Sequence, residues 1–265
     1  MQGRDRRRAL ARSAGRDRIE HRHRLVSRAG RDALISTLRI GPPPAELVRS
    51  ALDRAFADAE ARGGLVAALD AGCGRNSILA AYRSRIGRFV GADVHSPPDG
   101  SLAYLDEFVV ADLCADSEAF PPASFDVILS NFTVEHFADP PAAFANLRRW
   151  LRPGGHLVIT TVNRRHPFVR SYLGIPPRAR ARLQRLVKTT AADAHPLVGA
   201  CNDPRTLQAA LASAGFTSVD IQTTGHLARA WGRRLPTFTL GLIGDLAVKP
   251  VASRRSTIVA EAVAP

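Results

Sequence analysis

The sequence has little of what marks several protein classes. Its 265 residues contain three cysteines that are far apart and form no CxxC pair, so neither a disulfide framework nor a metal site is predicted. No apolar run approaches the roughly 18–20 residues that span a bilayer. The arginine-rich N-terminus is not followed by the apolar segment of a secretory signal, so we expect a cytoplasmic protein.

Lysine is almost absent, since only Lys188 and Lys249 occur among 37 basic residues. The net charge of +13 is concentrated in residues 1–40, which hold 12 arginines and 4 acids. We expect residues 1–40 to form a mobile basic arm, either a solvated tail or a cover for a site or an anionic partner. Hydrophobic residues make up 45% of the chain, which is typical of a globular protein.

Short apolar runs alternate with helical patterns through the middle of the chain. The runs expected to be strands are 65–70, 88–94, 107–113, 124–132 and 156–162, followed by 217–224 and 256–263. The segments with helical spacing are 45–61, 75–85, 139–151 and 203–216. This alternation predicts an α/β fold with a doubly wound, mostly parallel sheet that is covered on both faces.

Two segments are too long to be simple connections, namely 163–202 and 225–255. Loops of this length in a compact domain are typically lids, so we expect them to be substrate caps. The arginines of the first, such as Arg164 and Arg165, either bind an anionic group of the substrate or form a solvated face. The second insertion, which includes Trp231, has two interpretations. It contacts a membrane surface or an apolar substrate, or it forms a packed cap or a homodimer contact.

A glycine-rich turn, DAGCGRN (70–76), follows the first predicted strand. Glycines let the backbone approach a ligand closely, and a helix that begins there offers unpaired N–H groups. A dinucleotide fingerprint would need glycine at position 77, where Ser77 stands, so a nicotinamide cofactor is not favoured.

Two further acids end the next predicted strands. Asp93 follows the second strand, where a carboxylate can accept both hydroxyls of a ribose. Asp112 follows the third, where it can accept from an adenine amino group while the Leu113 N–H meets a ring nitrogen. Because ligands of doubly wound folds bind at the carboxyl ends of the strands, Asp70, Asp93 and Asp112 together predict an adenosine-containing cofactor.

The segments LDAGCG, GADV, ADL, FPPASFDVILSNFTVEHFADP and RWLRPGGHLVITTVN follow one another in this order. They resemble the class I S-adenosylmethionine-dependent methyltransferases, and within these the type 11 group that acts on small molecules. The resemblance covers residues 64–163. It implies a Rossmann-like seven-stranded sheet with an antiparallel last strand, a methyltransferase domain over 41–265, and S-adenosyl-L-methionine as the cofactor.

The resemblance also implies contacts to this cofactor. Asp70 would orient the methionine amino group, the backbone of Gly72, Cys73 and Gly74 would pass beside the cofactor, Asp93 with Val94 would contact the ribose, Asp112 with Leu113 the adenine, and Asn131 the methionine end. Asn76 stands where the family often has a third glycine. Asparagine tolerates a left-handed backbone better than most residues, so the turn can be kept.

Methyl transfer from a sulfonium depends largely on positioning, and a hydroxyl acceptor is helped by a base with a near-neutral pKa. Histidine suits that role. The candidates are His136, His166 and His195. The Glu135–His136 pair could instead only shape the cofactor pocket.

We therefore expect an enzyme that methylates a small molecule, on a hydroxyl oxygen of a secondary metabolite, a quinone-like phenol, or an envelope sugar or lipid. The alternatives are a nucleic-acid methyltransferase and a non-catalytic cofactor-binding protein. The run SNFT (130–133) lacks the Asn/Asp-Pro-Pro-Tyr pattern of amino-directed base methylation, and no cysteine follows the fourth strand for cytosine C5 chemistry. Nucleic acid is therefore not the expected partner.

Overall fold

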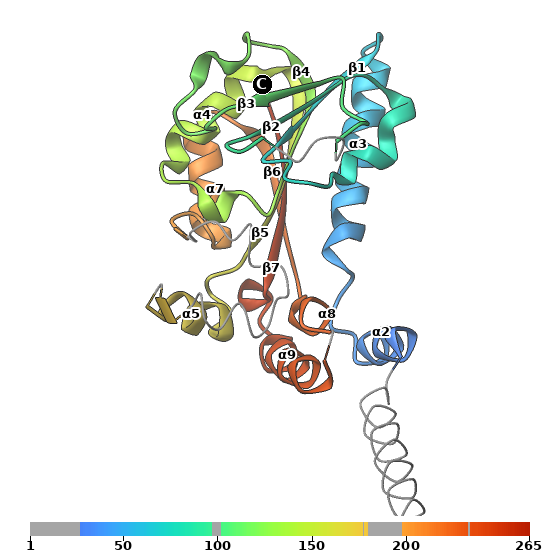
Figure 1. Cartoon of the computed structure of the whole chain (residues 1–265), viewed down its shortest axis with the longest axis vertical. Coiled ribbons are helices and arrows are strands. Elements are labelled where there is room, and N and C mark those ends of the chain that lie inside the picture. The colour runs from blue at the N-terminus through green and yellow to red at the C-terminus, as the bar shows by residue number, and fades with distance from the viewer. Residues whose placement is uncertain (1–26, 97–101, 177, 180–197, 233) are drawn as a thin grey trace, which may run out of the picture.

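The computed structural model describes residues 27–96, 102–176, 178–179, 198–232 and 234–265, which build a seven-stranded sheet with helices on both faces (Figure 1). The strands are β1 (Val66–Ala71), β2 (Ile86–Asp93), β3 (Glu107–Val110), β4 (Phe125–Asn131), β5 (Leu151–Val162), β6 (Thr217–Thr224) and β7 (Thr257–Val263). The α-helices are α2 (Arg28–Thr37), α3 (Pro44–Ala61), α4 (Pro140–Trp150), α5 (Pro167–Leu173), α7 (Pro204–Ser213), α8 (Leu227–Ala230) and α9 (Leu235–Val248). The 3-10 helices are η1 (Ile78–Arg85), η2 (Ser117–Ala119), η3 (Val134–His136) and η4 (Ala252–Arg254).

The strands lie in the order β3-β2-β1-β4-β5-β7-β6. The pairs among β1 to β5 are parallel, whereas β7 runs antiparallel to both β5 and β6. The chain therefore starts at the centre, winds outward through β2 and β3, and returns to wind the other way from β4. The predicted doubly wound, mostly parallel sheet with an antiparallel last strand is confirmed. The carboxyl ends of β1 to β6 share one edge, called the carboxyl edge below.

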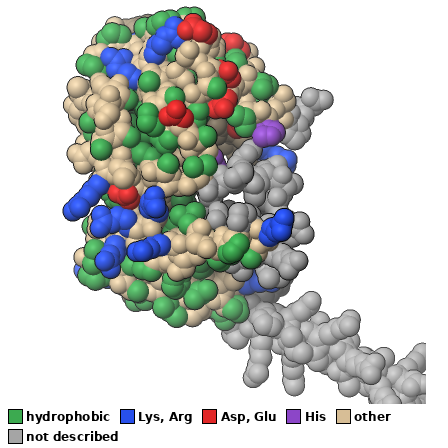
Figure 2. Space-filling view, turned by 90° about the vertical axis from the view of Figure 1, so that its left-hand side faces the viewer, with side chains coloured by type: hydrophobic (Ala, Val, Ile, Leu, Met, Phe, Trp, Pro, Cys, Tyr) green, Lys and Arg blue, Asp and Glu red, His purple; other side chains and the backbone are tan. Residues whose placement is uncertain are grey.

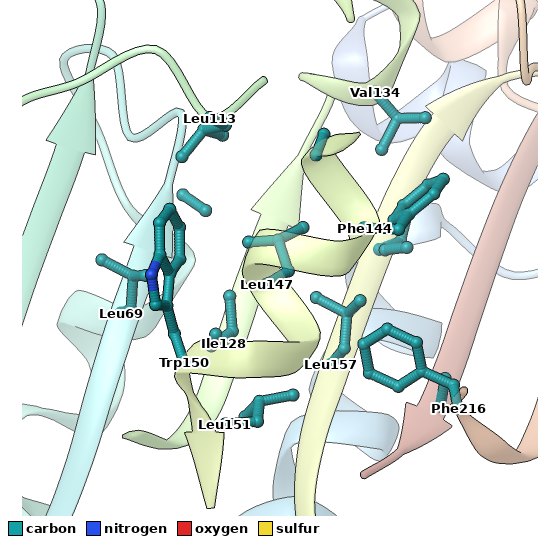
Figure 3. Close-up of a cluster of buried hydrophobic side chains, with 14 of the residues drawn as sticks. Leu69, Leu113, Ile128, Val134, Phe144, Leu147, Trp150, Leu151, Leu157 and Phe216 are labelled. Carbon is teal, nitrogen blue, oxygen red and sulfur yellow. The ribbon is translucent and has the colours of Figure 1, made fainter. Parts of the chain in front are cut away.

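The central strands are apolar because both sheet faces are covered. All six residues of β1 are buried, and so are all residues of β4 except the last. On one face, Leu52 and Phe56 of α3 pack against Ala68 of β1. On the other face, α4 and α7 contribute to a larger cluster in which Leu147 and Trp150 lie against the sheet (Figure 3).

Several predicted boundaries differ from the structure. The strand predicted over 107–113 ends at Val110, and the helix predicted over 203–216 ends at Ser213. The helical pattern of 75–85 forms the 3-10 helix η1, which starts only at Ile78; its buried residues Leu79 and Tyr82 are three apart, matching three residues per turn. The last predicted parallel strand starts at Leu151 rather than at 156, because Gly154 at φ +73° lets the chain turn without leaving the sheet.

Both long insertions contribute helices beyond the carboxyl edge. The first begins with α5, and the second forms α8 and α9. In Figure 1 these helices and α2 gather at the lower end of the molecule, below the strands. Their position fits a cap over the carboxyl edge.

The expected boundary of the basic arm at residue 40 is wrong. Residues 28–37 form α2, and Ile35 and Ile40 are buried in a cluster with Phe238 of α9. The sequence did not indicate this because arginines surround the few apolar residues of the segment. The residue that these pack against lies about 200 residues further along the chain. The arm remains a prediction for residues 1–26, which lie outside the described residues.

Candidate functional site

The residues predicted to bind the cofactor gather at the carboxyl edge. Asp70 lies near the end of β1, and Asp93 and Asn131 are the last residues of β2 and β4. Asp112 lies in the turn that follows β3. Parallel pairing brings these strand ends side by side, which the sequence positions alone suggested.

The glycine turn after β1 folds back over β2. The N–H groups of Gly72 and Cys73 both donate to the Ala92 carbonyl, at 2.7 and 3.1 Å. Gly72 has φ +82°, and a Cβ there would lie 2.3 Å from the Oγ1 of Thr133. Gly74 has φ +52°, and a Cβ there would meet nothing within 4 Å. The turn is therefore tightly packed at Gly72 and open at Gly74, where a ligand can approach the backbone.

Asp70 is a buried carboxyl group, with only 2% of its surface exposed. Burial raises the pKa of this carboxyl to about 7, the Ser77 side chain lowers it by a smaller amount through a hydrogen bond, and the nearby Asp93 carboxylate raises it. The charged group that acts on Asp70 is thus the Asp93 carboxylate, which disfavours the ionised form of Asp70. A cation placed here would favour the ionised form of Asp70.

Asp93 holds the backbone of two turns. Its Oδ2 accepts from the Gly74 N–H at 3.0 Å and its Oδ1 from the His95 N–H at 3.2 Å. The side chain is only partly buried, so each oxygen keeps a second acceptor site that a hydroxyl group can use. Val94 follows with 46% of its surface exposed, which leaves an apolar surface beside this carboxylate.

Asp112 and Leu113 form a turn that is fixed from both sides. Oδ1 of Asp112 accepts from the Cys114 N–H at 2.8 Å, and the Asp112 N–H donates to Asp116 at 2.7 Å. The Leu113 carbonyl accepts from the side-chain amide of Asn146 at 2.9 Å, and its side chain is buried. The Asp112 side chain is exposed, so it can accept a hydrogen bond from a ligand.

These groups fit S-adenosylmethionine. The buried carboxyl of Asp70 lacks only a positive charge, which an amino group or a sulfonium would supply. The open backbone at Gly74 lies directly beside Asp93, and the exposed acceptor of Asp112 lies at the next strand end. Within the described ranges, His, Cys, Asp and Glu side chains form no group of three that could hold a metal ion.

His136 lies in η3, directly after β4, and is partly buried. Its neighbour Glu135 is buried and accepts from the Thr161 hydroxyl at 2.8 Å. The Glu135 carbonyl also accepts from the N–H groups of Val198 and Gly199, at 2.9 and 3.1 Å. Glu135 therefore ties the loop after β4 to the end of the first insertion.

The other two predicted histidines lie differently. His166 is fully buried, and its Nδ1 accepts from the Phe168 N–H at 3.1 Å while its Nε2 donates to the Gly244 carbonyl at 3.3 Å. Both ring nitrogens are thus engaged by the backbone, and His166 caps α5, so its catalytic role stays a prediction that would need one of these hydrogen bonds to open. His195 lies outside the described residues.

His226 is a residue that the sequence interpretation missed. Its Nδ1 is buried and has no hydrogen-bond partner among the described residues. Its ring stacks on Phe132, with 6.3 Å between centroids, and Phe132 follows β4 in a left-handed backbone conformation, φ +55°. Burial lowers the pKa of the His226 imidazole to about 4, and the Arg229 guanidinium acts in the same direction.

The position of His226 could have been found from the sequence. It follows the predicted strand 217–224 by two residues, as Asp112 follows β3. Because β6 runs in the same direction as β5, its end lies at the same carboxyl edge. His226 thus has the same sequence signal as the acids, namely a polar side chain directly after a strand end.

Comparison with known families decides the identity. Residues 43–221 match the family model described as a methyltransferase domain. The chain belongs to this family. The match begins at α3 and extends into β6, so it includes the glycine turn and the acids at the carboxyl edge. This methyltransferase fold is the class I type, whose cofactor is S-adenosylmethionine.

Several curated methyltransferases are similar to the chain. Nocamycin O-methyltransferase of Saccharothrix syringae is 30% identical over 166 residues, covering 57% of this chain and 59% of that protein. Ubiquinone biosynthesis O-methyltransferase of Cereibacter sphaeroides is 36% identical over 107 residues, covering 36% and 41%. Phosphoethanolamine N-methyltransferase 1 of Arabidopsis thaliana is 33% identical over 113 residues, covering 43% and 19%. The chain spans less than two thirds of each relative.

Solved structures share the fold. A SAM-dependent methyltransferase from Archaeoglobus fulgidus superposes with a TM-score of 0.51 at 16% identity, covering 87% of this chain and 98% of that one. The [4+2]-cyclase SpnF gives 0.50 at 19% identity, covering 83% and 81%. At such low identity these matches show the fold alone. Among the residues that the structure describes, no helix is both long and apolar enough to cross a bilayer.

Proposed function

We propose that the protein transfers the methyl group of S-adenosylmethionine to a hydroxyl group of a small molecule. The observation that carries this proposal is the carboxyl edge, where one buried carboxyl, two further carboxylates and an open glycine turn lie together. When bound, the cofactor supplies a methyl group on a positively charged sulfur. The protein contributes binding and orientation, which account for much of the rate enhancement in a displacement of this kind.

Each group at the edge has a proposed role. Asp70 pairs with the amino group of the cofactor, and the backbone of Gly72, Cys73 and Gly74 lies along it. Asp93 and Val94 contact the ribose, and Asp112 and Leu113 contact the adenine. Asn131 contacts the methionine end. The hydrogen bonds that already fix the carboxylates of Asp93 and Asp112 support this, because preorganised groups lose little freedom when a ligand binds.

Oxygen is the acceptor atom that we propose. The match to an O-methyltransferase extends over 166 residues, against 113 for the phosphoethanolamine N-methyltransferase. A hydroxyl must lose its proton during transfer, and a neutral imidazole can accept it or its hydrogen bond. His136 is the candidate for accepting the proton, and His195 remains one by prediction. His226, whose pKa is lowered to about 4, is a weak base and is the candidate for accepting the hydrogen bond of the hydroxyl. The exposed Arg164 and Arg170 would suit an anionic acceptor.

Cofactor affinity tests the proposal. Asp93→Ala and Asp112→Ala should each weaken S-adenosylmethionine binding about 10- to 100-fold, because each removes charge-assisted hydrogen bonds to the cofactor. Isothermal titration calorimetry measures the dissociation constants, and Asp220→Ala, an exposed change on β6, is the matched control. Unchanged affinity in both variants, or a wild type that does not bind the cofactor, would refute the proposal.

His226 is tested through transfer of a labelled methyl group to catechol. His226→Phe keeps a ring against Phe132 but has no nitrogen, so kcat/KM should fall about tenfold or more while cofactor affinity stays the same. His226→Asn can place a polar atom near the former Nδ1 and should recover part of the loss. Equal rates for wild type and His226→Phe would remove His226 from the site. Methylation of RNA instead of catechol would favour the nucleic-acid alternative.

A further inference from the structure

We propose that the outer face of α9 docks on the surface of an anionic lipid membrane. This outer face is defined by Leu235, Leu240, Ile243 and Val251, the last of which follows the helix. The inference does not depend on the identity of the methyl acceptor. It starts from the distribution of exposed apolar side chains and of charge.

Exposed apolar side chains are concentrated here. Nine large hydrophobic side chains are exposed among the described residues, and five of them are Leu34 of α2 and the four residues of the α9 outer face. Leu240 and Ile243 are three residues apart, on one side of the helix, with 49% and 56% of their surfaces exposed. Clusters of this kind mark interaction surfaces more often than single exposed residues do.

The inward side of α9 is closely packed, and Leu242 and Leu246 belong to it, whereas Leu235 and Leu240 face outward. A Cβ on Gly241 would lie 2.7 Å from the Leu227 carbonyl carbon, and a Cβ on Gly244 would lie 2.8 Å from the Phe168 ring. Asp245 is also turned inward, where it accepts from the Ala228 N–H at 2.9 Å. The inward side thus takes up these small residues and the acid together with Phe238 and Val248, while Leu240 and Ile243 stay at the surface.

The segment that carries this face is mostly basic, although the exposed Asp32 of the neighbouring α2 acts on Arg229. Residues 225–255 contain six basic residues and a single acid, Asp245, which is buried. Arg234 precedes α9 and Arg254 follows it, both exposed. Figure 2 shows, from the side, that basic side chains gather on the lower part of the molecule while acidic ones gather mostly on the upper part. Basic residues beside an apolar surface are attracted to anionic lipid head groups.

A second copy of the chain fits this face less well. A two-fold contact brings the same patch of both copies together. The cations at the two ends of α9 would then face like charges, which is unfavourable. An anionic bilayer satisfies the apolar and the basic groups at once. Figure 1 places α9 at the end of the molecule beyond the carboxyl edge, so a docked membrane would lie on the side of the proposed site.

Vesicle sedimentation tests the inference. The full-length protein should pellet with vesicles of phosphatidylcholine and phosphatidylglycerol, should pellet poorly with phosphatidylcholine alone, and should be released by added salt. The double variant Leu240→Glu, Ile243→Glu should bind the mixed vesicles at least about tenfold more weakly. The control is Leu65→Glu, which places one such charge on an exposed leucine just before β1, at the opposite edge of the sheet, and the single variant Ile243→Glu matches it in charge.

Cofactor binding separates this inference from the proposed function. The double variant should bind S-adenosylmethionine with the affinity of the wild type, which would also show that it is folded. A loss of vesicle binding can then be attributed to the changed face of α9. A wild type that ignores phosphatidylglycerol vesicles, or a double variant that binds them as well as the wild type does, would overturn the inference. So would a dimer, measured by light scattering, that the double variant dissociates.

Discussion

Gly72→Ala is expected to weaken S-adenosylmethionine binding by about 100-fold. Gly72 has φ +82°, a conformation that costs an alanine about 1–2 kcal/mol. The added Cβ would also lie 2.3 Å from two atoms of Thr133 and 2.8 Å from a third. No flexible chain end can move aside there, so the turn itself must shift, and the backbone proposed to lie along the cofactor shifts with it.

Gly215→Ala is the control that separates the strain of a positive φ from the clash of the added Cβ with Thr133. Gly215 has φ +87°, a Cβ added to it would meet nothing within 4 Å, and it lies after α7, outside the site. Gly215→Ala should therefore cost stability without changing cofactor affinity. Thr133→Gly in the Gly72→Ala background should recover part of the affinity, because it removes the colliding atoms. Calorimetry on the four proteins measures this, and an affinity for Gly72→Ala within a few-fold of wild type would contradict the account.

The strand ends at the site could be predicted because their signals are local. Each apolar run ends within a few residues at an acid or a glycine, as at Asp70 and Asp93. These strand-ending residues can be recognised in the sequence without knowing what packs against the strand. Parallel pairing then follows from the helices between the runs. The same local signals explain why the order of the elements was predicted correctly over residues 45–162.

The remaining features depend on contacts between distant parts of the chain. Ile35 becomes a core residue only because Phe238 packs beside it, and neither local sequence shows this. The Nε2 of His166 is engaged by the carbonyl of Gly244, which α9 supplies, and its own segment does not show this partner. The place of His226 after a strand end can be read from the sequence, but its burial against Phe132 cannot. Spacing can name such residues, but it cannot say what surrounds them.

Asp70→Asn is expected to stabilise the protein without cofactor at about pH 8. The pKa of Asp70 is raised from 3.8 to about 7, so between these values the folded protein keeps a proton that the unfolded chain releases. The free energy of unfolding contributed by this group is therefore highest below about pH 4. It falls as the pH rises and levels off above about pH 7, on the order of 4 kcal/mol lower.

The side-chain amide introduced by Asp70→Asn does not ionise, so this loss should be absent in the variant. Urea unfolding of both proteins from about pH 5 to 8 should give a difference that grows with pH and then levels off. Taking the difference at each pH cancels the titration of the other groups, and Asp220→Asn, at an exposed position on β6, should show no such trend.

The same variant should bind S-adenosylmethionine more weakly, because the carboxylate that is costly in the free protein is the partner proposed for the amino group. Binding to the wild type should for the same reason weaken below about pH 7, where Asp70 holds its proton. Higher stability combined with lower affinity is the pattern of a group kept for function rather than for folding. A destabilised Asp70→Asn at about pH 8 would show that Asp70 is ionised and satisfied within the protein itself, and unchanged affinity would show that Asp70 is not the partner of the amino group.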